Sequence, residues 1–141
     1  MTRAMDRGRV LVLIGSVLAL IGMALPWVTV GGKADGLPQI TANGFDGAGI
    51  LVFVAAILML ALLTLPYASK TGSSTLDRPA SYLALTVIGF AGLILEAATL
   101  INQGHLGFPD SALGLWLSAA GLAIAGWGVG ELLNGDRARR R

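Results

Sequence analysis

The feature that most constrains this chain is a set of four long apolar runs separated by short polar segments. The runs cover residues 10–27, 48–65, 80–101 and 112–133. Each is about 18–22 residues long and would reach roughly 27–33 Å as a helix, at about 1.5 Å per residue. The hydrocarbon core of a bilayer is about 30 Å thick. The sequence therefore predicts a single membrane domain over residues 1–141 with four transmembrane helices.

Composition excludes a soluble fold. Of the 141 residues, 55% are hydrophobic and only 13% are charged, whereas soluble domains carry roughly 25% charged residues. A chain this short cannot hide so much apolar surface from water in its own core. The sequence pI of about 9.5 comes from the chain ends and one loop and not from a basic face, so nucleic acid is not an expected partner. There is no cysteine, which excludes disulfides and thiolate chemistry.

Basic residues predict the orientation of the chain. With the N-terminus inside, nine of the ten Lys and Arg residues fall on the inner side and only Lys33 falls outside. The nine are Arg3, Arg7, Arg9, Lys70, Arg78, Arg137, Arg139, Arg140 and Arg141. The loops are short, so the positive-inside rule applies, and we expect a plasma (inner) membrane protein with both termini cytoplasmic. A cleaved signal peptide is the alternative for the first run, but Pro26, just after the small residues Gly22 and Ala24, disfavours it.

The first outer loop, residues 28–46, is long enough to hold structure of its own. Two β-prone patches, Val28–Val30 and Gln39–Thr41, flank a segment rich in Gly, Asp and Pro. This pattern is typical of two strands joined by a turn. We expect a small β-hairpin-like unit on the outer surface.

The fourth run carries two sets of small residues. The first set is spaced 4-3-4-3 and consists of Gly114, Ser118, Gly121, Ala125 and Gly128. Gly126 and Gly130 form a GxxxG pair on a different face. Small residues let membrane helices approach closely, so this helix is expected to have neighbours on two sides, one of which can be a partner protein.

Small residues also recur in the first and third runs. They are Gly15, Ala19, Gly22 and Pro26 in the first, and Gly89 and Gly92, in line with Glu96, Thr99 and Gln103, in the third. The second run carries bulky residues in most directions, so we expect it to face lipid more than the others do. The heptad-like spacing predicts a left-handed four-helix transmembrane bundle, an all-α membrane fold.

Glu96 is the one ionisable residue well inside an apolar run. A carboxyl group in the hydrocarbon is costly, which makes it a candidate for a proton relay, an ion site or a counter-ion. The competing interpretation is a neutral acid that is hydrogen-bonded to a neighbouring helix and supports packing. We favour packing, because no second buried ionisable residue completes a relay.

Other polar residues form no catalytic or cofactor pattern. Glu131 lies near Arg137, which predicts either an interfacial ion pair or simple solvation of the carboxylate. His105, the single histidine, has Asp110 nearby but no partner at metal-binding spacing. The serines have no histidine on their side of the membrane, and there is no nucleotide-binding motif. We therefore predict no catalytic residues, no metal and no cofactor.

Residues at the ends of the runs are expected to anchor the protein at the membrane surface. Trp27 and Tyr67 close the first two runs, where aromatic rings suit the headgroup region. The C-terminal tail adds Arg137, Arg139, Arg140 and Arg141. Arginines at this position are attracted to anionic lipid.

Two families share the layout of this chain. Trp27 followed by the strand-forming Val28–Val30 resembles claudin-like proteins, although their paired cysteines are missing here. Pro26-Trp27 at the outer end of the first span is similar to small uncharacterised four-span membrane proteins of actinobacteria. That resemblance implies no specific activity, but some proteins of this kind are accessory subunits of respiratory or lipid-transport complexes. Small multidrug-resistance transporters and proton-translocating proteolipids match less well, because their membrane carboxylate lies in the first or the last helix.

We therefore expect a non-enzymatic accessory or scaffold subunit of a larger cell-envelope complex. Its expected partners are the lipid bilayer and other membrane protein subunits. The alternative is a small oligomeric transporter or proton-coupled carrier that uses Glu96. The chain can also form a homo-oligomer, although a homo-oligomer without other subunits would contradict the accessory-subunit hypothesis. A membrane enzyme ranks third.

Overall fold

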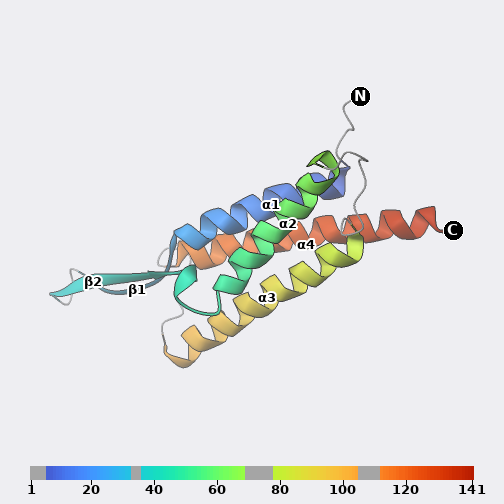
Figure 1. The fold of residues 1–141 in the computed structure, drawn as a ribbon. Helices are drawn as coiled ribbons and strands as arrows, with labels where there is room; N and C mark the ends of the chain where they lie inside the picture. The colour runs from blue at the N-terminus through green and yellow to red at the C-terminus, as the bar shows by residue number, and fades with distance from the viewer. Residues whose placement is uncertain (1–5, 33–35, 69–77, 105–111) are drawn as a thin grey trace.

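The computed structural model describes residues 6–32, 36–68, 78–104 and 112–141. It contains four helices, α1 (Arg7–Ala24), α2 (Ile50–Ala68), α3 (Pro79–Asn102) and α4 (Leu113–Arg139). Two strands, β1 (Pro26–Gly32) and β2 (Leu37–Asn43), and a short 3-10 helix, η1 (Gly44–Asp46), lie between α1 and α2. The four helices form one elongated bundle (Figure 1). The start of α1 and the end of α4 lie at one end of the bundle, and the two strands lie at the other.

All four helices are long and apolar enough to cross a membrane, which agrees with the predicted spans. Their most apolar windows have mean hydropathies of 1.7, 2.6, 2.1 and 1.5 in chain order. The predicted boundaries differ at several helix ends, since α1 begins at Arg7 and α2 continues to Ala68, each three residues beyond the predicted run. Helix α1 ends at Ala24, because Pro26 restricts Leu25 to the extended conformation (φ −85°, ψ 159°). Helix α4 continues beyond residue 133 to Arg139, so most of the arginine-rich tail is helical.

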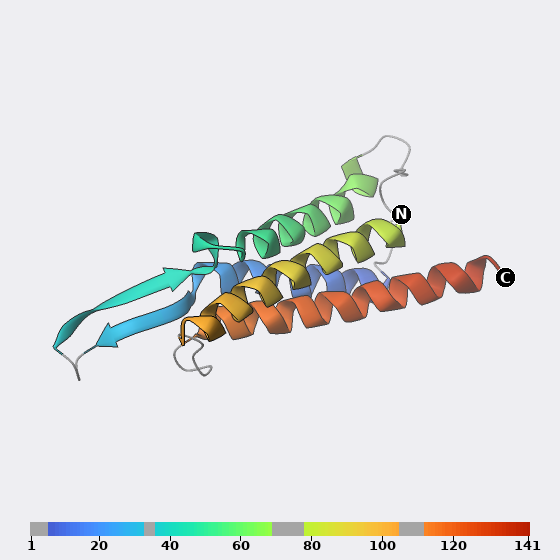
Figure 2. The same cartoon turned by 90° about the horizontal axis from the view of Figure 1, so that it is seen from below.

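The predicted hairpin is confirmed. Strands β1 and β2 pair antiparallel, with Thr29 opposite Thr41, and Gly36 in the connection has a positive φ of 67°. The hairpin extends away from the helices and does not fold back over them (Figure 2). It therefore exposes surface beyond the end of the bundle.

The structure does not single out α2 as the most lipid-facing helix. In the apolar window of α2, 33% of the residues are buried, against 28% in α3. Val52, Ala55, Ala56 and Met59 of α2 are completely buried. Bulky side chains cover α2 on most sides, but these four form one face that packs into the core between α1 and α3.

Candidate functional site

The closest helix contact joins α1 and α4 through two matching sets of glycines. The sets are spaced seven residues apart and consist of Gly8, Gly15 and Gly22 on α1 and Gly114, Gly121 and Gly128 on α4. A Cβ atom at Gly8 would lie 2.8 Å from the carbonyl oxygen of Gly128, and one at Gly22 would lie 2.8 Å from that of Gly114. A Cβ atom at Gly121 would lie 2.6 Å from the carbonyl oxygen of Gly15. The two backbones therefore touch along the full length of α1, in antiparallel register.

The remaining small residues of the predicted α4 stripe lie at the same contact. Ser118 and Ala125 are fully buried, and the hydroxyl of Ser118 donates a hydrogen bond to the carbonyl oxygen of Ala19 at 3.2 Å. The stripe is therefore covered by α1 of the same chain, and it is not an open docking face. Gly8 was not predicted as a contact residue, because the predicted first span begins at Val10. The seven-residue spacing back from Gly15 points to Gly8 in the sequence.

The second small-residue face of α4 is only partly covered. A Cβ atom at Gly126 would lie 3.5 Å from Cγ2 of Thr86 and 3.6 Å from the ring of Phe90, so Gly126 faces α3. No heavy atom of the described residues lies within 4 Å of a Cβ atom at Gly130. Among the described residues, Gly126 and Gly130 therefore do not form one shared helix contact.

Glu96 forms a hydrogen bond with the start of another helix. Its Oε2 atom accepts from the backbone N–H of Ala48 at 2.8 Å, two residues before α2 begins. Gly92, one turn earlier on α3, makes this possible, since a Cβ atom there would lie 2.5 Å from Cβ of Leu51. The close approach at Gly92 brings Glu96 within reach of the α2 N-terminus.

This position accounts for a carboxyl group among apolar residues. The first N–H groups of a helix have no partner within the helix, and the partial positive charge there attracts a carboxylate. Gly47 leaves space for the Glu96 carboxyl, since a Cβ atom at Gly47 would collide with it. Glu96 is half-buried and faces α2, whereas Thr99 and Gln103 of the same predicted stripe are exposed.

Trp27 does not lie where a headgroup anchor would lie. Its side chain is 1% exposed, and its indole N–H donates to the carbonyl oxygen of Gly22 at 2.9 Å. A Cβ atom at Gly44 would lie 2.7 Å from the indole ring, and one at Gly49 would lie 3.1 Å from it. The ring is covered by the backbone of η1 and of the turn that follows. It connects the hairpin to the helices and is not available to lipid.

At the opposite end of the bundle, Glu131 joins α1 to α4. Its Oε1 atom lies 3.4 Å from Nε of Arg7 and accepts a hydrogen bond from the indole N–H of Trp127 at 3.2 Å. The expected partner of Glu131 was Arg137, four residues from the C-terminus. The partner in the structure is Arg7, because the antiparallel contact brings the start of α1 beside the last turns of α4.

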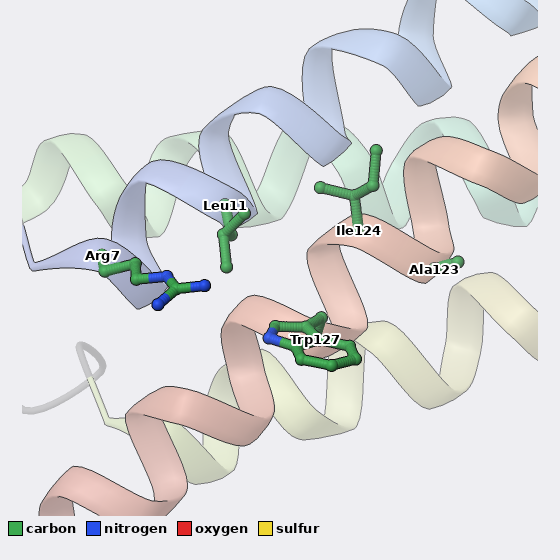
Figure 3. A pocket seen from close by; sticks show the side chains of 5 residues that line it. All are labelled: Arg7, Leu11, Ala123, Ile124 and Trp127. Carbon is green, nitrogen blue, oxygen red and sulfur yellow. The ribbon is translucent and has the colours of Figure 1, made fainter.

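A groove of about 360 Å³ lies beside this ion pair. Leu11 of α1 and Ala123, Ile124 and Trp127 of α4 line its apolar part, and Arg7 lies at one end (Figure 3). The guanidinium group of Arg7 points along the groove toward Trp127. The groove is shallow and open, so it cannot enclose a substrate.

The other predicted anchors are exposed. Tyr67 is 62% exposed, and the four tail arginines are exposed as well. Arg140 forms an ion pair with Asp136 at 3.1 Å. Their role at the headgroup region stays a prediction. His105 and Asp110 lie outside the described residues.

Within the described ranges, no group of three His, Cys, Asp or Glu side chains lies close enough to hold a metal ion. The described residues pack four helices together, hold a hairpin at one end of the bundle and leave apolar side chains exposed on the helices. No protein-family model, curated protein or solved structure matches this chain.

Proposed function

We propose that the chain is a non-enzymatic accessory or scaffold subunit of a larger cell-envelope complex, of the respiratory or lipid-transport type. It spans the plasma (inner) membrane four times, with its termini in the cytoplasm and its hairpin outside. Insertion is supported by the outer helix surfaces, where Val87, Ile94 and Trp127 are 60%, 64% and 67% exposed. Apolar surface on this scale requires lipid or protein to cover it.

Charge supports the orientation. The described basic side chains belong to the start of α1, the start of α3 and the end of α4, which lie together at the end of the bundle opposite the hairpin (Figure 1). A membrane protein keeps such an end cytoplasmic. The seven-residue spacing of the glycines supports the left-handed crossing that we propose for α1 and α4.

The hairpin is the observation that carries the subunit proposal. In the described part of the chain its sheet contains β1 and β2 alone, so β2 keeps one edge that no strand of this sheet pairs. An open strand edge is a template for a strand of another protein. Ile40 on β2 is 66% exposed, which provides an apolar side chain at this edge. The small-residue stripe of α4 is covered by α1 of the same chain. We therefore propose that the hairpin, and not α4, binds the partner protein.

Site-specific photo-crosslinking tests this proposal. A photoreactive residue at Ile40 should form a crosslink to one defined membrane or envelope protein in intact cells. The same residue at Val87, of similar exposure but on α3, is the matched control and should react with lipid. Mild-detergent purification followed by mass spectrometry should recover the same partner. Recovery of only this chain, as a homo-oligomer, would contradict the proposal.

A carrier that works through Glu96 is the competing proposal. Glu96→Gln distinguishes the two, because glutamine keeps an acceptor for the Ala48 N–H but cannot carry a proton. In proteoliposomes containing a pH-sensitive dye, a carrier would move protons and lose this activity in the variant. A scaffold subunit would show no proton flux in either form.

A further inference from the structure

The groove between α1 and α4 combines an apolar floor with a basic end. Leu11, Ile124 and Trp127 supply the apolar side chains, and Arg7 is the first residue of α1. From Arg7 to Leu11 the helix rises about 6 Å. In a bilayer, the groove therefore begins at the membrane surface and continues a short way into the hydrocarbon.

A groove at this depth is filled by lipid, because an empty or water-filled apolar surface inside the hydrocarbon is unfavourable. The flexible occupant that fits a shallow open groove is an acyl chain. The basic end adds selection of the headgroup. Arg7 is 80% exposed, and one ion pair to Glu131 does not use the five N–H donors of a guanidinium group. Arginine binds phosphate through paired N–H groups.

We propose that this groove binds an anionic phospholipid, with an acyl chain against Leu11, Ile124 and Trp127 and the phosphate at Arg7. Glu131 keeps Arg7 at the mouth of the groove, since its carboxylate contacts both Arg7 and Trp127. It also partly neutralises Arg7, so it weakens the attraction for a second anion. The inference goes beyond the subunit proposal and needs only that the helices lie in a bilayer.

The fluorescence of Trp127 can show which lipid lies in the groove, because this residue lines it. The full chain would be placed in bilayers of phosphatidylcholine and phosphatidylglycerol, with bromine on the acyl chains of one lipid at a time. Bromine quenches tryptophan fluorescence on contact. Trp27 is 1% exposed and escapes quenching, and Trp116→Phe removes the other exposed indole. In this background, brominated phosphatidylglycerol should bind beside Trp127 about fivefold more strongly than brominated phosphatidylcholine.

Two arginine variants separate a site from general surface charge. Arg7→Gln should abolish the preference for phosphatidylglycerol. Arg140→Gln is the matched control, because Arg140 is 78% exposed, pairs with an acid, and directly follows α4, which ends at the end of the bundle where α1 begins. It should leave the preference unchanged. Glu131→Gln should increase the preference, since it removes the competing carboxylate. Ala123→Phe should lower quenching by both lipids, because the ring occupies the groove.

Equal quenching by the two lipids would overturn the lipid site while leaving membrane insertion intact. An equal loss of preference in Arg7→Gln and Arg140→Gln would also overturn it, as would displacement by inorganic phosphate alone. Absence of quenching by either lipid would contradict insertion itself, and so the proposed function as well.

Discussion

At the scale of single residues, Glu96 is understood through its contact with the start of α2. Its carboxylate accepts the Ala48 N–H at 2.8 Å, and Gly47 leaves space for it. A hydrogen bond from Glu96 to a neighbouring helix was one of two predictions from the sequence. Ala48 could not be identified as the partner, because the position of a loop N–H group depends on how closely α3 approaches α2.

Replacement of Glu96 should reveal this capping role. Glu96→Ala should lower the free energy of unfolding by about 1–2 kcal/mol, since it removes a partner from the helix N-terminus. Glu96→Gln should lose less unfolding free energy, because the amide oxygen of glutamine still accepts the hydrogen bond from Ala48. Reversible unfolding in mixed detergent micelles, followed by circular dichroism, measures both. Equal losses of unfolding free energy in the two variants would show that the hydrogen bond from Ala48 to Glu96 does not stabilise the protein.

Trp27 supports a second residue-scale prediction. Trp27→Phe should cost about 1–2 kcal/mol of unfolding free energy, because the Gly22 carbonyl loses its indole partner and the smaller ring leaves space. Tyr67→Phe is the control, since Tyr67 is 62% exposed near the end of α2. It should change stability by less than about 0.5 kcal/mol. A headgroup anchor at Trp27 would instead make both substitutions nearly neutral in micelles.

At the scale of elements, the antiparallel contact of α1 and α4 organises the bundle. The 4-3-4-3 spacing of the small residues in the sequence places them on one side of α4, and these residues are buried. The sequence did not predict which helix covers that face. Small residues show where a backbone can approach, but the partner depends on all four helices and on the loops that join them. The large side chains of α2 do not show how much of this helix faces lipid, because large side chains occur both at lipid contacts and in the core.

A pair of glycines on α4 tests this contact. Gly121→Ala should destabilise the protein by roughly 1–3 kcal/mol, because its Cβ atom would lie 2.5 Å from the backbone nitrogen of Ala19. Gly130→Ala meets no described heavy atom within 4 Å. It should be neutral or stabilise the helix by up to about 1 kcal/mol. Unfolding in mixed micelles gives the comparison, and similar values for the two variants would contradict the tight contact.

At the scale of the whole molecule, the bundle has two unlike ends. One carries the hairpin, and the other carries the beginning of α1, the end of α4 and the described arginines (Figure 1). Because the four helices alternate in direction, the start of α1 and the end of α4 lie at the same end of the bundle. The hairpin was predictable from its β-prone patches and turn residues. The direction of the hairpin away from the bundle was not predictable. It depends on the packing of the Trp27 ring against the backbone at Gly44 and Gly49, which holds the hairpin against α1.

Cysteine labelling tests the proposed arrangement in the membrane most directly. The chain contains no cysteine, so each introduced cysteine reports on one position. In intact cells, a membrane-impermeant maleimide should label Ile40→Cys at the outer hairpin and should not label Arg141→Cys until the membrane is permeabilised. Val87→Cys, on the outer surface of α3, should stay unlabelled throughout. Labelling of Arg141→Cys in intact cells, or of Val87→Cys in either state, would contradict a four-span protein with cytoplasmic termini.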